Sequence, residues 1–283
     1  MKKGKKDRFS NLILAFMLIA GLSLLIYPSF ADYWNSSRQT QVITHYAEAV
    51  ANMDTEEYNS LVDSARDYNN ALLDRFNSYL LEGNLEQRYY EELNFSGDGV
   101  MGYVQIDKIN VMLPVYHGTR EEILQVAIGH IEWSSLPVGG ESTHCVISGH
   151  RGLPSARLFT DLDKMAVGDT FVFHVLNQVI TYQVDQIKIV EPHVTEDLMI
   201  VEGEDYCTLV TCTPYGVNSH RMLVRGRRIE NLADQKVNMV TADALLIDPL
   251  LVAPFVAMPM LLALLIALFV PKKKKRKGGD DYE

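Results

Sequence analysis

Residues 208–216 read Thr-Leu-Val-Thr-Cys-Thr-Pro-Tyr-Gly, the most informative pattern in the chain. The first residues form an apolar, β-branched run that predicts a strand, and Pro-Tyr-Gly predicts a turn directly after it. Cys212 is therefore expected at a strand end, where its side chain can reach a surface. Arg221 follows nine residues later, which is the distance of one short hairpin.

A second strand is expected to end at residues 148–152, which read Ser-Gly-His-Arg-Gly. This segment places the imidazole of His150 at a predicted strand end, just as residues 208–216 place the thiol of Cys212 at one. A thiol, an imidazole and a guanidinium are the groups that thiol acyl transfer needs. The thiolate attacks, the imidazole moves the proton and the arginine stabilises the oxyanion. Cys212, His150 and Arg221 are the candidates for that chemistry.

Each candidate also has a purely structural interpretation. Cys212 could be a core thiol, since free cysteines are often buried. His150 could be a hydrogen-bonded core histidine, although its glycine neighbours suit a backbone that a ligand approaches. Arg221 competes with Arg225 and Arg227, and spacing does not choose among these three arginines.

The other cysteines point to packing rather than to disulfides. Cys207 and Cys212 are five residues apart, so on one strand they face opposite sides, and a bond between them is not expected. Cys145 is expected in the core. The six-residue spacing of His144 and His150 is weak evidence for zinc, because no thiolate cluster completes such a site. We predict no metal site and no cofactor.

The region from 97 to 231 is predicted to be mainly β. Many short strands with turns between them favour a closed barrel or a sandwich. The predicted strands are residues 102–106, 111–115, 144–147, 171–175, 179–184, 187–190, 206–211 and 221–225. Residues 31–96 lack strand alternation and have apolar residues at helical spacing, so we expect a helical arm of two or three helices.

Both ends of the chain carry apolar runs. Residues 12–27 follow a basic start, and residues 250–270 precede a basic tail at 271–283. The positive-inside rule then places both termini in the cytoplasm and residues 31–242 outside the membrane. The alternative for the segment 1–30 is a cleaved signal peptide. Residues 232–249 are expected to link the β domain to the second span.

The outer region is strongly acidic. The whole chain has a formal net charge of −10, and residues 31–242 alone carry about −15. Such a surface argues against nucleic acid as a partner. It would suit a basic protein substrate, although an acidic surface also simply keeps a domain soluble.

Together these segments resemble the sortases of Gram-positive bacteria, and more narrowly the pilus-assembling class C. The resemblance covers residues 97–228 and includes the active-site strand and hairpin at 208–226, the segment 148–156, residues 113–119 and residues 159–162. It implies an eight-stranded β-barrel with an N-terminal helical arm. A hydrophobic segment at each end also fits class C.

The resemblance implies a cysteine transpeptidase. Sortases cleave a Leu-Pro-x-Thr-Gly (LPxTG) type signal between Thr and Gly. By position, Cys212 would form the thioacyl intermediate, His150 would be the general acid/base, and Arg221 would stabilise the oxyanion or position the substrate. Class C members pass the acyl group to a lysine of a pilin subunit. The alternatives are a sortase that uses a peptidoglycan amine and, from another class, an inactive membrane-tethered scaffold.

Class C sortases often carry a lid with an Asp-Pro-aromatic triplet. Residues 74–76 read Asp-Arg-Phe, with arginine where proline is usual. By resemblance, Asp74 would pair with an active-site arginine and Phe76 would cover Cys212. Losing the fixed φ of proline predicts a less rigid lid. The alternative is an amphipathic helix over residues 72–80 with Asp74 in solvent.

Overall fold

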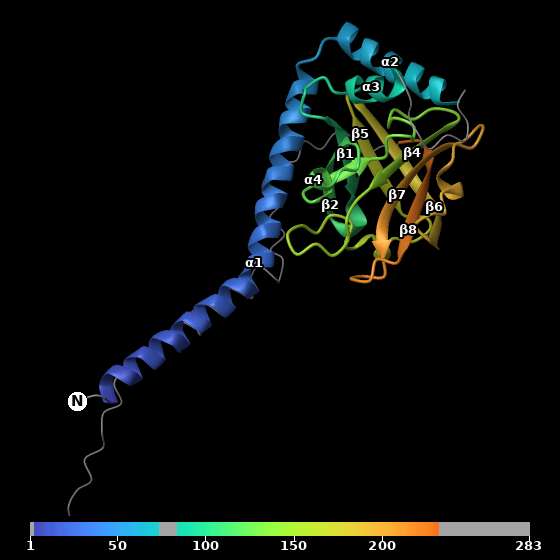
Figure 1. The fold of residues 1–283 in the computed structure, drawn as a ribbon. Helices are drawn as coiled ribbons and strands as arrows, with labels where there is room; N and C mark the ends of the chain where they lie inside the picture. The colour runs from blue at the N-terminus through green and yellow to red at the C-terminus, as the bar shows by residue number, and fades with distance from the viewer. Residues whose placement is uncertain (1–2, 74–83, 232–283) are drawn as a thin grey trace, which may run out of the picture. The chain divides into compact units, whose positions relative to one another are not determined.

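The computed structural model describes residues 3–73 and 84–231 (Figure 1). It divides the chain into two compact units, of which the larger is Ala31–Val240. The possible lid residues Asp74 and Phe76 lie outside the described residues. The same holds for the predicted linker at 232–249, the second apolar run at 250–270 and the basic tail at 271–283.

The β domain is a closed barrel of eight strands in the order β1-β2-β3-β4-β7-β8-β6-β5, which confirms the expected barrel. Neighbouring strands are antiparallel except for the parallel pairs β2–β3 and β4–β7. The strands are β1 Val100–Ile106, β2 Val111–His117, β3 Ile128–His130, β4 Thr143–Ser148, β5 Thr170–Val175, β6 Gln178–Val190, β7 Asp205–Thr213 and β8 His220–Ile229.

Two features of the barrel differ from the predicted strands. β3 was not predicted, because its three residues, Ile128–His130, are too short to show alternation. The runs predicted at 179–184 and 187–190 form the single strand β6, and the register shifts between Val184 and Gln186 where it pairs with β8. This bulge interrupts the alternation and makes one strand look like two.

Helices precede the barrel. The helices are α1 Lys3–Ala51, α2 Thr55–Leu73 and α3 Asn84–Glu91, and a single turn, α4 Glu121–Leu124, lies between β2 and β3. In the part of the chain that the structure describes, the helix over residues 12–51 is long and apolar enough to cross a membrane by length and composition. The predicted span at 12–27 lies within it, and Leu24 and Leu25 are exposed.

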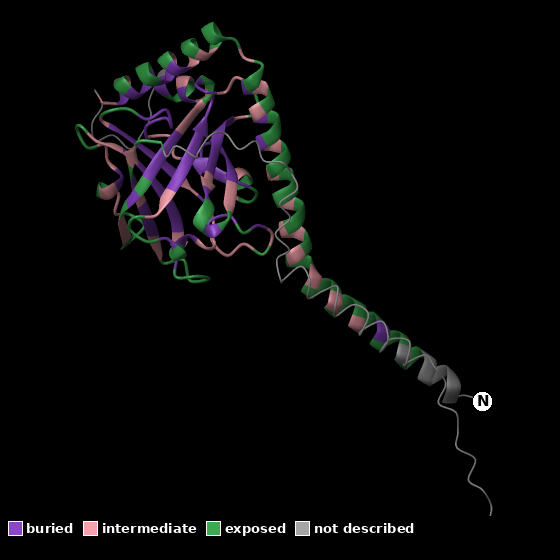
Figure 2. Cartoon of the chain, turned by 180° about the vertical axis from the view of Figure 1, so that it is seen from behind, coloured by how far each residue is buried: buried purple, intermediate pink, exposed green. Residues whose placement is uncertain are grey.

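The later part of the helical arm packs on the barrel and shares its core. Val62 and Tyr68 of α2 and Leu85 of α3 belong to the same buried cluster as the barrel interior. Figure 1 shows α2 and α3 over one end of the barrel, and Figure 2 shows buried residues concentrated in the strands. Asn69 exchanges two hydrogen bonds with the backbone of Leu136, at 2.7 and 3.1 Å. The arm is therefore part of one fold with the barrel.

A buried histidine joins α3 to the barrel. The hydroxyl of Tyr89 lies 3.1 Å from Nδ1 of His130, and Nε2 of His130 lies 2.8 Å from the carbonyl oxygen of Ser135. His130 is fully buried, and burial lowers its pKa from 6.5 to about 3. Folding therefore favours the neutral imidazole.

This gives a pH prediction for residues 31–240. Because the folded-state pKa of His130 is lowered, its contribution to stability is complete above pH 6.5 and is lost as the pH falls from 6.5 toward about 3. One such group contributes a slope of up to about 1.4 kcal/mol per pH unit. Urea unfolding at pH 6.5, 5.5 and 4.5 should show a smaller loss in His130→Asn than in the parent. The exposed His193→Asn should behave like the parent, and equal losses in all three proteins would contradict the assignment.

Candidate active site

Cys212 occupies the second-to-last position of β7. Its Cα partner across the antiparallel β7–β8 pair is Arg221. The hairpin predicted from the nine-residue spacing is thus present, and the thiol and the guanidinium start from paired positions. Side chains at paired positions of neighbouring strands lie on the same face of a sheet.

His150 lies on the other side of Cys212. In the parallel β4–β7 pair, Ser148 is the partner of Val210. The contact continues beyond the end of β4, since the amide of Gly149 donates to the carbonyl of Val210 at 3.0 Å and Oγ1 of Thr211 donates to the carbonyl of Gly149 at 2.8 Å. One step further along this register, His150 comes beside Cys212.

Gly149 is required at this position by space. A Cβ there would come within 2.7 Å of both Ile128 and Phe159, which are buried in the barrel. Any side chain would push the backbone away from the core and move His150 with it. The glycine therefore keeps the loop close to β7.

Ion pairs with acidic residues distinguish Arg221 from Arg225 and Arg227, the two other candidate arginines. Arg225 makes a two-point contact with Asp185, at 3.0 and 2.8 Å. Arg227 pairs with Glu204 at 2.8 Å. Arg221 has no ion pair within the described residues, and its Nη1 donates to the carbonyls of Asn218 and His220, both at 3.2 Å. Its charge is the one of the three left for a ligand.

The three cysteine side chains also differ in how far they are buried. Cys145 and Cys207 are buried partners across β4 and β7, and Cys212 is partly exposed. Burial raises the pKa of Cys145 well above its usual value. The expectation that Cys145 is a core residue is confirmed. Of these thiols, only Cys212 can meet a substrate.

Arg151 ties the loop after His150 to the end of β7, a role that the sequence did not reveal. Its Nη1 donates to Oγ1 of Thr213 at 3.4 Å, and it forms an ion pair with Asp163. Its guanidinium also lies 6.0 Å from the centre of the Tyr215 ring. Thr213 and Tyr215, which follow Cys212, therefore contact the loop after His150 through Arg151.

Helix α1 contacts the same loop. Nδ2 of Asn35 donates to the carbonyl of Ser155 at 2.7 Å, and the amide of Arg157 donates to Oδ1 of Asp32 at 2.8 Å. These bonds hold the loop from its outer side. The loop after His150 is thus bounded by α1 and by β7.

The described residues contain no group of three or more His, Cys, Asp or Glu side chains that could hold a metal ion. His144, the possible zinc partner of His150, instead contacts the carbonyl of Met199 and the hydroxyl of Thr208, at 2.8 and 2.7 Å. Both of its ring nitrogens are therefore occupied. This leaves the zinc interpretation of the His144 and His150 spacing without support.

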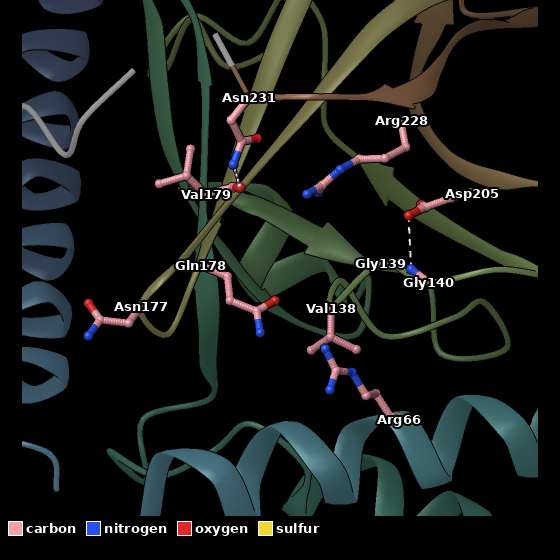
Figure 3. Close-up of a pocket in the computed structure, with 10 residues that line it drawn as sticks. All are labelled: Arg66, Val138, Gly139, Gly140, Asn177, Gln178, Val179, Asp205, Arg228 and Asn231. Carbon is pink, nitrogen blue, oxygen red and sulfur yellow. Dashed lines mark hydrogen bonds between the residues drawn. The ribbon is translucent and has the colours of Figure 1, made fainter. Parts of the chain in front are cut away.

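A cavity of about 480 Å³ lies elsewhere, at the end of β7 where Asp205 begins the strand (Figure 3). Arg66 of α2 and Arg228 of β8 reach toward it. Burial raises the pKa of Asp205, whose carboxylate accepts from the amide of Gly140 at 2.8 Å. Because Cys212 lies at the opposite end of the strand, the cavity is separate from the candidate catalytic residues.

Comparison with known proteins agrees with this geometry. The sortase domain matches residues 104–229. The crystal structure of sortase C1 from Streptococcus agalactiae is 50% identical, with a TM-score of 0.66, and covers 68% of this chain and 100% of that chain. Sortase C of Clostridium perfringens, solved with the C-terminal cell wall sorting motif, is 41% identical, with a TM-score of 0.60 and coverage of 68% and 99%.

The chain belongs to the sortase family. Its solved relatives named sortase C make it a class C sortase transpeptidase, as the sequence resemblance implied. Sortase D of Bacillus subtilis (strain 168) is more distant, at 28% identity over 131 residues, and the match spans 45% of this chain and 63% of that protein.

The burial of the thiols predicts how this sortase reacts with a thiol reagent. A maleimide should label about one cysteine in the native full-length chain, because buried thiols are inert, and about three in urea. Cys212→Ala should reduce native labelling to near zero, whereas Cys145→Ala should leave it unchanged. Native labelling that persists in Cys212→Ala would show that the core thiols are accessible. Mass spectrometry gives the count.

Proposed function

We propose that this sortase polymerises pilin subunits. It cleaves an LPxTG-type signal between Thr and Gly, holds the acyl group on Cys212 and transfers it to a lysine side chain of another pilin. The observation that carries the proposal is the order His150–Cys212–Arg221, with His150 just after the end of β4, Cys212 on β7 and Arg221 on β8. The reaction needs a base on one side of the thiol and an oxyanion donor on the other.

The first half-reaction forms a thioester. The Cys212 thiolate attacks the carbonyl carbon of the signal threonine, and the carbonyl oxygen becomes an oxyanion. Arg221 donates hydrogen bonds to that oxygen, for which its unpaired charge is suited. The imidazolium of His150 gives its proton to the glycine nitrogen as the Thr–Gly bond breaks, and glycine leaves as a neutral amine.

The second half-reaction reverses these roles. A neutral lysine amine attacks the thioester carbonyl, His150 accepts the proton that the amine loses, and the Cys212 thiolate leaves. The product is an isopeptide bond between two subunits. Water would give hydrolysis instead, so a covered site that admits an amine favours transfer.

The identity of the substrates is supported by relatives. The Clostridium perfringens sortase C was solved with a cell wall sorting motif, and this chain is 41% identical to it. The structure of Streptococcus pneumoniae sortase C, to which this chain is 46% identical, was described as giving insight into pilin substrate specificity, which favours a pilin as partner over a peptidoglycan amine. The N-terminal apolar helix supports membrane association. We place the catalytic domain on the extracellular face, with a second span at residues 250–270.

The polymerisation prediction uses the full chain in detergent and a pilin that ends in an LPxTG signal. A denaturing gel should show a ladder that resists heat and reductant, since isopeptide bonds survive both. Cys212→Ala should abolish it, with a fall of at least about 10³-fold in rate, as expected for loss of a nucleophile. A pilin trimmed at Thr-Gly without a ladder would contradict the lysine acceptor and favour a wall amine. No Cys212-dependent product would contradict the proposal as a whole.

The lid is a separate proposal, since it concerns residues outside the described ranges. If Asp74 and Phe76 cover Cys212, the double variant Asp74→Ala/Phe76→Ala should react faster with a maleimide. A lid stabilised by about 1.4 kcal/mol would change the rate about tenfold. Equal rates in the parent and in the double variant would refute the covering role. Glu122→Gln, which replaces an exposed residue of α4, serves as the control.

A further inference from the structure

One edge of the catalytic imidazole has no hydrogen-bond partner. The Nε2 atom of His150 is buried, and no described residue forms a hydrogen bond with it. A buried ring nitrogen without a partner is unusual, because leaving it unsatisfied costs free energy. Its ion-pair partner among the described residues is the carboxylate of Glu121, whose Oε2 lies 3.6 Å from Nε2. This distance is within reach of an ion pair but too long for a hydrogen bond.

The position of Glu121 is defined by its own helix. It is the first residue of α4, and its Oε1 accepts a hydrogen bond from Nε2 of Gln125, one turn later. One carboxylate oxygen is therefore held within α4, and the other faces His150. Its neighbour Glu122 is also exposed and makes no hydrogen bond or ion pair with the described part of the chain.

Two arginines lie on elements next to His150, and within the described residues neither forms a hydrogen bond or an ion pair with its ring. Arg221 lies beyond Cys212 on β8, and Arg151 follows His150 in the same loop, although Arg151 is paired with Asp163. The charged group that contacts the ring is therefore the carboxylate of Glu121, which attracts a positive imidazole.

We propose that Glu121 is a positioning residue of the active site. Its carboxylate, held by Gln125, faces the Nε2 edge of His150 and stabilises the imidazolium. This leaves Nδ1 as the nitrogen that exchanges protons with the thiol and with the substrate amines. The assignment rests on the proposed role of His150 as general acid/base, and it adds the group that orients this residue. Which ring nitrogen works is set by the partner of the other.

Glu121→Gln tests the charge with little change in shape, since glutamine can still accept from Gln125. With a quenched LPxTG peptide and the full chain in detergent, kcat should fall about threefold with KM unchanged, a size expected for a partly exposed pair. The alkaline limb of the pH–rate profile should move to lower pH. Glu121→Asp should restore part of the rate. Glu122→Gln is the matched control and should behave like the parent.

A second readout does not depend on activity. Nitrogen NMR of the histidine-labelled chain, with the His150 signal assigned from His150→Asn, reports the protonated fraction of the ring at each pH. That fraction should be lower in Glu121→Gln than in Glu122→Gln near neutral pH. Identical fractions in the two variants would overturn the role of Glu121. Lack of peptide cleavage by the parent would instead contradict the proposed function, and the NMR comparison would still decide the role of Glu121.

Discussion

The parallel pairing of β4 with β7 is the constraint on which the active site depends. Two bonds, from Gly149 to Val210 and from Thr211 to Gly149, extend that ladder past the end of β4. They fix the position along β7 at which the chain carrying His150 continues beyond β4. Because side chains alternate along a strand, a slip of one residue would turn Cys212 to the opposite face. The proposed chemistry therefore depends first on the register between β4 and β7, which one backbone bond and the hydroxyl of Thr211 extend to Gly149.

The same strand keeps its two cysteines apart. Cys207 and Cys212 differ by an odd number of positions, so alternation sends one to the core and the other to the surface. Cys207 meets Cys145 of β4 in the interior, and neither is exposed. One strand thus places a packed thiol near its beginning and a partly exposed thiol near its end. This explains how a chain with three thiols can offer a single one to a substrate.

Much of the barrel could be predicted from the sequence, because alternation and turn residues are local signals. β3, at Ile128–His130, could not, since a three-residue strand becomes stable only when β2 and β4 flank it. The choice of Arg221 over its competitors also required strand pairing and the acidic partners of the other arginines. Glu121 gave no local signal, because only the tertiary fold brings α4 to His150. Cys212 and His150 could be picked out from the sequence, since each follows an apolar run and precedes a turn.

The charged side chains near Cys212 follow one another with alternating sign. The carboxylate of Glu121 lies on the outer side of His150, and the guanidinium of Arg221 starts from the position paired with Cys212. In the state where the imidazole is protonated and the thiol ionised, signs alternate from one group to the next, and each charge has an opposite neighbour. Charges arranged in this way stabilise one another. Without Glu121, the imidazolium would have the thiolate of Cys212 on one side and no anion at its Nε2 edge. In the proposed mechanism, the carboxylate of Glu121 helps His150 to hold the proton that it gives to glycine, while Arg221 donates to the oxyanion.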